Sequence, residues 1–107
     1  MNFSDHEYFP PRRTARPVKT GRLTIGGDAP IAVQSMTKTD TREVEKTVEQ
    51  IHQMEAAGCE IVRLAVPDLA AAQALPRIRQ YCPESILVSD IHFQYKFALM
   101  ALDAGID

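Results

Sequence analysis

Three side chains in this sequence are suited to binding an anion or moving a proton: Arg63, Asp90 and His92. Arg63 lies within the apolar segment Glu60–Val66, and Asp90 and His92 lie at the end of a second apolar segment, Ile86–Ile91. The planar guanidinium of arginine matches phosphate and carboxylate groups. Histidine can donate a proton or a hydrogen bond near neutral pH, and a nearby aspartate can orient it. The residue types therefore predict a site for an anionic ligand.

The alternation of residues along Glu60–Val66 predicts the direction of Arg63. One face of such a strand carries only aliphatic side chains and is expected to pack against helices, so Arg63 points to the opposite side. A buried guanidinium without a partner is very costly, which leaves two hypotheses open: a structural salt bridge, for instance to Asp90, or a clamp for a phosphate or carboxylate. The aliphatic face consists of Val62, Leu64 and Val66.

The Asp90-x-His92 pair also has a structural and a functional interpretation. As a metal site it provides two ligands with no evident third, so we predict no metal site. Gln34, Ser35 and Thr37 end a further apolar segment and could donate hydrogen bonds to a polar ligand. Their alternative role is simple capping of the loop that follows.

Three strand–helix units are predicted to position these residues. The expected strands are Ile31–Met36, Glu60–Val66 and Ile86–Ile91, each followed by apolar residues at helical spacing. Asp40 and Glu43 have the spacing of a capping box, Asp68 is expected to cap the second helix, and Pro76 is expected to kink or split it. The helical stripes are Val44, Val48, Ile51 and Met54; Ala71, Ala74, Leu75 and Ile78; and Tyr95, Ala98, Leu99 and Leu102.

This alternation predicts an α/β fold, in which ligands bind at the carboxyl ends of the strands. We favour a partial (β/α)₈ barrel: its first three units follow a short hairpin over Val18–Ile25, and a whole barrel has about 250 residues. A doubly wound sheet is the alternative, because the pattern alone does not separate the two. Residues 1–16 are expected to form a flexible extension and 17–107 the amino-terminal part of the barrel. A fourth strand is expected to start at Gly105, so we expect a larger protein.

The composition is that of an ordinary globular chain. Of its 107 residues, 45% are hydrophobic and 24% charged, with a net charge of −2. This charge predicts neither nucleic-acid nor membrane binding, and no apolar run reaches the roughly 18 residues of a membrane span. No secretory signal is evident, and Cys59 and Cys82 lack a Cys-x-x-Cys pairing, so we expect free thiols in a reducing cytoplasm.

Five sequence blocks resemble the amino-terminal part of the 4-hydroxy-3-methylbut-2-en-1-yl diphosphate synthase family. The resemblance runs in order from about residue 12 to the end, and the third and fifth blocks together are specific. The blocks are Arg12-Arg13-x-x-Arg16-Pro17-Val18; Gly26-Gly27-x-x-Pro30-Ile31; Val33-Gln34-Ser35-Met36-Thr37-x-Thr39-Asp40-Thr41; Ala57-Gly58-Cys59-Glu60-Ile61-Val62-Arg63-Leu64-Ala65-Val66-Pro67; and Asp90-Ile91-His92-Phe93.

The resemblance implies a TIM-barrel domain followed by a smaller domain with a [4Fe–4S] cluster. The family opens and reductively dehydroxylates 2-C-methyl-D-erythritol 2,4-cyclodiphosphate in the non-mevalonate route to isoprenoids. It takes its electrons from flavodoxin or ferredoxin, and the full-length protein is expected to form a homodimer whose cluster domain closes over the partner's substrate.

Carried over by position, Arg63 resembles a diphosphate-binding arginine, His92 resembles a second polar contact at the barrel mouth, and Asp90 is its neighbour. Gln34, Ser35 and Thr37 correspond to the rim of the first strand. We assign no catalytic residue within this segment, and Cys59 and Cys82 do not match the cluster ligands, so we expect these 107 residues alone to be inactive.

Two alternative functions remain open from the sequence. One is a barrel like dihydropteroate synthase, which also binds a diphosphate-bearing substrate at its strand ends and needs no cluster. The other is a non-catalytic barrel fragment that acts only by pairing with another chain.

Overall fold

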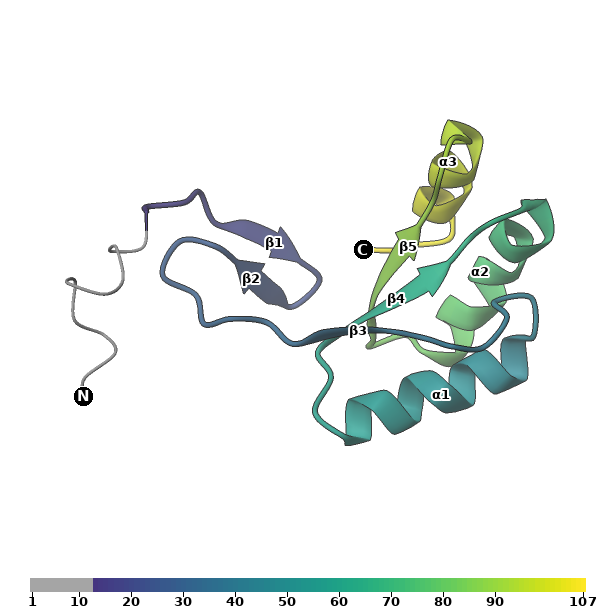
Figure 1. Cartoon of the computed structure of the whole chain (residues 1–107), viewed down its shortest axis with the longest axis horizontal. Helices are drawn as coiled ribbons and strands as arrows, with labels where there is room; N and C mark the ends of the chain where they lie inside the picture. Colours follow the sequence, from purple (N-terminus) through teal and green to yellow (C-terminus); the bar gives the residue numbers. More distant parts are fainter. Residues whose placement is uncertain (1–12) are drawn as a thin grey trace.

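The computed structural model describes residues 13–107, so Arg12 and most of the extension predicted over residues 1–16 lie outside the described residues. Eight elements follow in order (Figure 1). They are β1 (Val18–Thr20), β2 (Leu23–Ile25), β3 (Gln34–Met36), α1 (Val44–Ala56), β4 (Ile61–Ala65), α2 (Leu69–Tyr81), β5 (Ile86–Asp90) and α3 (Tyr95–Asp103). The predicted α/β pattern is therefore confirmed, although β3 is shorter than the strand expected over Ile31–Met36.

The central sheet is parallel, with the strand order β3-β4-β5. Gln34 is paired with Ile61, and Arg63 is paired with Met36 on one side and Val88 on the other. Each strand is joined to the next by a helix, as parallel neighbours require. The carboxyl ends of all three strands therefore meet at one edge of the sheet.

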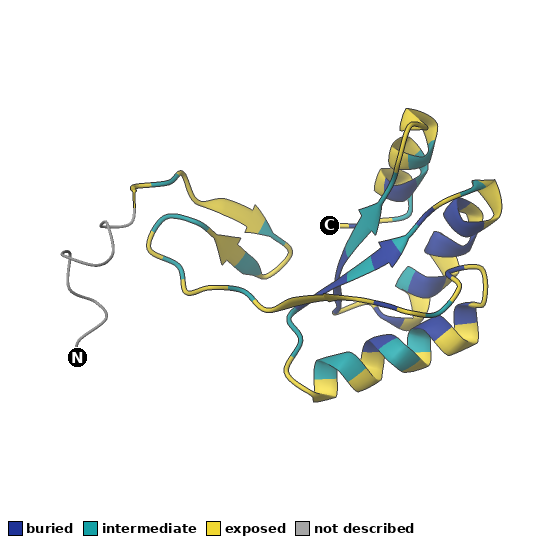
Figure 2. Ribbon diagram, viewed as in Figure 1, coloured by how far each residue is buried: buried dark blue, intermediate teal, exposed yellow. Residues whose placement is uncertain are grey.

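The hydrophobic core lies on one face of this sheet. Val62 and Leu64 are fully buried and belong to one cluster with side chains from all three helices, and Figure 2 shows the buried positions concentrated between the sheet and the helices. Burying a large aliphatic side chain contributes about 1.5–3 kcal/mol. The opposite face, on which Arg63 lies, has no helix over it within residues 13–107. The helical members of the cluster include Ile51, Leu75, Ile78 and Ala101.

The first helix begins later than its sequence predicts. Its N-cap is Glu43, which makes no side-chain capping bond, and the capping box expected from Asp40 and Glu43 is wrong. Asp40 instead pairs with Arg42, while the amide of Glu43 donates to the Asp40 carbonyl at 2.9 Å. The acidic side chain is already engaged in the loop, so it cannot cap the helix.

The second helix confirms its predicted cap and is not split by its proline. Asp68 is its N-cap and accepts a hydrogen bond from the amide of Ala71 at 2.9 Å, as expected. Pro76 does not split the helix, which runs from Leu69 to Tyr81. The buried face of α2, which includes Leu75 and Ile78, anchors it against the sheet on both sides of the proline.

The third helix forms where the sequence predicts it, but its most regular apolar stripe is exposed. Tyr95, Leu99 and Leu102 are 72%, 54% and 67% exposed. The face that meets the core carries Phe97, Met100, Ala101 and Ala104 instead. None of the three described helices is long and apolar enough to cross a bilayer.

The short antiparallel hairpin β1–β2 is confirmed, with its turn at Gly21 and Arg22. Arg22 donates to the carbonyl of Glu84 at 2.9 Å, just before β5. A Cβ atom on Gly21 would lie 3.0 Å from the Ile86 side chain, so the close approach and the positive φ of 57° both favour glycine. The hairpin thus lies at the amino end of β5, away from the predicted site.

Candidate functional site

Arg63, Asp90 and His92 come together at the carboxyl end of the sheet. The Arg63 Nη2 lies 3.1 Å from Asp90 Oδ2, and the His92 Nε2 lies 3.2 Å from Asp90 Oδ1. Each carboxylate oxygen thus has one cationic or potentially cationic neighbour. The ion pair with Asp90 is one of the two alternatives left open for Arg63, and a ligand contact stays a prediction. Asp90 also brings His92 into the same group, which we call the Asp90 cluster.

The register of the sheet explains how Arg63 reaches Asp90. Ala65 is the direct neighbour of Asp90, whereas Arg63 is paired with Val88, two positions earlier. Paired residues of a parallel sheet share a face, so all four lie on the face opposite the helices. The methyl group of Ala65 leaves room for the guanidinium to lie diagonally across the strand pair.

The Asp90 cluster is accessible to a ligand. The Asp90 side chain is 21% exposed, that of Arg63 38% and that of His92 74%. Among residues 13–107, Asp90 is the ion-pair partner of both Arg63 and His92, and it is the one ion-pair partner of the guanidinium. A guanidinium has five N–H donors, so most of them remain free for an incoming phosphate or carboxylate.

Thr37 reaches the site differently from its prediction as a ligand donor. Its side chain is buried, and both its amide and its hydroxyl point to the carbonyl of Arg63, at 3.0 and 3.4 Å. Thr37 therefore joins the end of β3 to β4 at the level of Arg63. This is the loop-capping alternative, and the carbonyl that Thr37 contacts belongs to Arg63 itself.

The loop between β3 and α1 is held by side chains that the sequence did not single out. Thr41 donates to the Ala65 carbonyl at 2.5 Å, and Gln50 accepts from the amides of Lys38 and Thr39 at 2.7 and 3.2 Å. Thr47 is fully buried and lies 2.9 Å from the Thr39 hydroxyl. These bonds fix the loop at the carboxyl edge. Threonine in an apolar–polar pattern gives no sign of such partners, which become visible only in three dimensions.

Gln34 and Ser35 lie further from the Asp90 cluster. Gln34 is level with Ile61, near the amino end of β4, and Ser35 is paired with Val62 and so belongs to the helix-covered face. Both are exposed. The short β3 does not bring either side chain to the level of Arg63, and their part in ligand binding stays a prediction.

An ion-pair network joins the β3–α1 loop to the β4–α2 loop. Arg42 makes a two-pronged contact with Asp40, with Nε 3.0 Å from both carboxylate oxygens, and its Nη1 lies 3.8 Å from Asp68. The Arg42 side chain, and then its amide, lower the pKa of Asp40, while Asp40 raises the pKa of Arg42. The network braces the carboxyl edge of the sheet from outside the Asp90 cluster.

The two cysteines do not fit a [4Fe–4S] cluster, which cysteine thiolates usually hold in a set of four. Cys82 is buried beside His52, with Sγ 3.6 Å from Nε2, and burial followed by the charge of Glu55 raises the pKa of its thiol. Cys59 lies in the loop before β4, with Sγ 3.0 Å from the Ile61 carbonyl. Within residues 13–107 no three His, Cys, Asp or Glu side chains are grouped to hold a metal ion.

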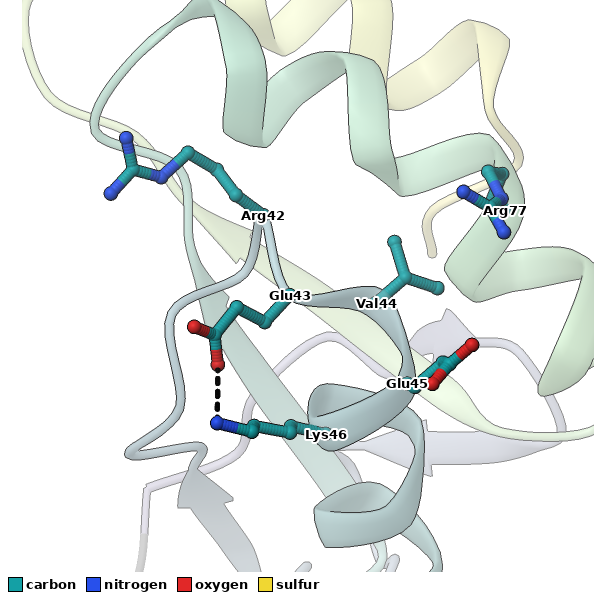
Figure 3. Close-up of a pocket in the computed structure, with 6 residues that line it drawn as sticks. All are labelled: Arg42, Glu43, Val44, Glu45, Lys46 and Arg77. Carbon is teal, nitrogen blue, oxygen red and sulfur yellow. Dashed lines mark ion pairs between the residues drawn. The ribbon is translucent and has the colours of Figure 1, made fainter.

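A hollow of about 310 Å³ lies between the start of α1 and the middle of α2 (Figure 3). Its lining charges oppose one another, and Glu43 already pairs with Lys46 at 3.3 Å. The lining mixes three basic and two acidic side chains and includes no residue of the Asp90 cluster, so the hollow is separate from the candidate site. Its lining residues are Arg42, Glu43, Val44, Glu45, Lys46 and Arg77.

A parallel sheet whose strands alternate with helices, and whose helices cover one face, defines an α/β domain. Consistent with this class, a family model described as the GcpE TIM-barrel domain matches residues 15–107. The chain belongs to the GcpE family.

Relatives of this chain carry the name 4-hydroxy-3-methylbut-2-en-1-yl diphosphate synthase (flavodoxin). The one from Lawsonia intracellularis is 56% identical over 96 residues, which is 90% of this chain and 26% of the relative. Those from Dehalococcoides mccartyi and Geobacillus kaustophilus are 55% and 53% identical, again over 90% of this chain, and 27% and 25% of each relative is covered. The chain thus spans about a quarter of the length of these relatives.

Proposed function

We propose that this chain forms the amino-terminal part of the barrel of a 4-hydroxy-3-methylbut-2-en-1-yl diphosphate synthase. The observation that carries the proposal is the Asp90 cluster, placed at the carboxyl edge of the sheet in a chain that is more than half identical to enzymes of that name. The family match favours this function over a barrel like dihydropteroate synthase.

The same arrangement supports a (β/α)₈ barrel whose first three units are β3–α1, β4–α2 and β5–α3. In a doubly wound sheet helices cover both faces. Here Val62 and Leu64 face all three helices, and the face of Arg63 carries none among residues 13–107. That face corresponds to the inside of a barrel, and its carboxyl edge to the barrel mouth.

The substrate class follows from the donors in the Asp90 cluster. A cyclic diphosphate offers several anionic oxygens, which suit the free N–H groups of Arg63 and the imidazole of His92. Asp90 contacts Arg63 through Oδ2 and His92 through Oδ1, so the two side chains lie on different oxygens of its carboxylate. In this proposal Arg63 binds a phosphate group, His92 provides a second contact, and Asp90 orients both.

The remaining parts of the activity depend on groups beyond these residues. A [4Fe–4S] cluster would supply electrons for removing the hydroxyl group, and its ligands would come from cysteines other than Cys59 and Cys82. Flavodoxin is the proposed electron donor, with ferredoxin as the other candidate, and a homodimer in the cytoplasm is the proposed working form.

Genetic complementation tests the proposal. A bacterium depleted of its own synthase would receive the full-length gene that encodes this segment, either unchanged or with Arg63→Ala, with Arg77→Ala as a control on an exposed arginine. We expect growth with the unchanged gene and the control, and little growth with Arg63→Ala. Failure of the unchanged gene to restore growth, despite soluble protein, would argue against the function.

A further inference from the structure

Phe93 lies at the centre of a strained turn that directly follows the Asp90 cluster. Its φ is 66°, and it is the one residue other than glycine with a positive φ among residues 13–107. The amide of Gln94 donates to the carbonyl of His92 at 2.8 Å. A bond between residues two apart, closed around a left-handed centre, defines a γ-turn of the rare, strained kind. Such strain persists where the surrounding structure requires it, often at functional sites.

The side chain of Phe93 adds a second unusual feature, because it is fully exposed, at 104%. Its ring lies beside that of His92, with the centroids 6.2 Å apart and the planes tilted by 44°. An exposed phenyl ring gains nothing from burial, and glycine or asparagine would adopt the left-handed conformation more readily. Packing among residues 13–107 therefore explains neither the turn nor the ring.

Both features converge on His92. Its imidazole is 74% exposed, so few contacts limit its rotation, yet Nε2 lies 3.2 Å from Asp90. The turn fixes the His92 backbone through its carbonyl, and the two ring centroids, 6.2 Å apart, lie within the distance range of an aromatic pair. We infer that Phe93 is a positioning residue that holds the imidazole of His92 beside Asp90. Arg63 and His92, each beside one oxygen of the Asp90 carboxylate, can then both contact the same anionic ligand.

The ligand part of this inference rests on the proposed function, whereas the geometry of His92 does not. Two readouts on the full chain separate them: the NMR signals and Overhauser contacts of the His92 ring without ligand, and the affinity for inorganic pyrophosphate. Phe93→Ala removes the aromatic ring, and Phe93→Tyr keeps one at the same position. Tyr95→Ala is the matched control, since it removes an exposed aromatic ring two residues away, outside the turn.

We expect Phe93→Ala to abolish the Overhauser contacts that place His92 beside Asp90 and to weaken pyrophosphate binding about tenfold, as for one charge-assisted contact. Phe93→Tyr and Tyr95→Ala should resemble the unchanged chain, and the melting temperature should show whether Phe93→Ala still folds. Unchanged His92 signals in a folded Phe93→Ala chain would overturn the inference. The same holds if the variant alters the oligomeric state of the protein but leaves the His92 signals unchanged. If the unchanged chain binds no pyrophosphate but His92 still moves in Phe93→Ala, the positioning role stands and the proposed function fails.

Discussion

Ala65 lies directly beside Asp90 in the parallel sheet, and its small side chain leaves the diagonal space through which Arg63 reaches the Asp90 carboxylate at 3.1 Å. The face that these residues share carries no helix among residues 13–107. The contact between Arg63 and Asp90 therefore depends on a small side chain at position 65 as well as on the two charges.

Filling this space should break the ion pair. Ala65→Leu would place a branched side chain between Arg63 and Asp90, and we expect pyrophosphate affinity to fall about tenfold, the value of one lost charge-assisted contact. Ala65→Ser, which is nearly the same size, serves as the control and should bind normally. Calorimetric titration measures both, and equal affinity in the two variants would show that the diagonal space is unimportant.

Arg79 should be a major stabilising residue, although it lies at the opposite end of the sheet. Its side chain is only 17% exposed, donates to the carbonyls of Gly105, Cys82 and Ser85, and lies 2.6 Å from Asp107. Hydrogen bonds of charged groups contribute about 1.5–3 kcal/mol each, with losses that do not add fully. We expect Arg79→Ala to lower the free energy of unfolding by about 2–4 kcal/mol.

The control for Arg79 is Arg77→Ala, two residues earlier on the same helix and exposed. Urea unfolding followed by circular dichroism should show a change of less than about 0.5 kcal/mol for this variant. Similar midpoints for the two variants would contradict the role given to Arg79.

The contact between Asp40 and Arg42 makes a prediction about pH. The pKa of Asp40 is lowered in the folded chain, first by the Arg42 side chain and then by its amide. The folded state therefore favours the carboxylate: its contribution to stability is present above the unfolded pKa of about 3.9 and is lost as the pH falls through the lower, folded value.

Replacing the arginine should reverse only part of this shift. In Arg42→Ala the side-chain contact is lost, but the amide of residue 42 can still donate to Asp40. The pKa of Asp40 should rise toward its ordinary value without reaching it, as followed by carboxyl carbon NMR during an acid titration. A pKa that does not move would contradict the contact, and about 1 M salt should reduce the shift because both groups are exposed.

The position of Arg63 could be predicted because a strand has a fixed period of two. Val62 and Leu64 had to face the helices, so Arg63 had to face the other way, and the burial of these residues confirms it. The cap at Asp68 was also predictable, since a capping aspartate needs only the amide three residues later. Local rules suffice where every partner is a near neighbour in the sequence.

Other features depend on partners that are distant in the sequence. Asp40 has the spacing of a helix cap, but its side chain pairs with Arg42 instead. The apolar residues Tyr95 and Leu99 of α3 have helical spacing, yet both are exposed. The bond from Thr41 to the Ala65 carbonyl and the contacts of Arg79 with residues near 105 have no signature in the sequence. They follow from the tertiary fold, which brings loops of different units together.

The most direct test of the account compares Arg63→Ala with Arg63→Lys in the full-length protein, measuring affinity for the cyclic diphosphate beside thermal stability. The guanidinium is 38% exposed, so its ion pair with Asp90 should contribute less than about 1 kcal/mol to folding. A charge-assisted, two-pronged contact to the ligand is worth about 1.5–3 kcal/mol, which corresponds to a roughly ten- to hundredfold loss of affinity in Arg63→Ala. Lysine keeps the charge without the planar fork and should restore only part of the affinity. Unchanged affinity in both variants, or a collapse of the melting temperature with affinity retained, would contradict the role of Arg63 as the diphosphate clamp.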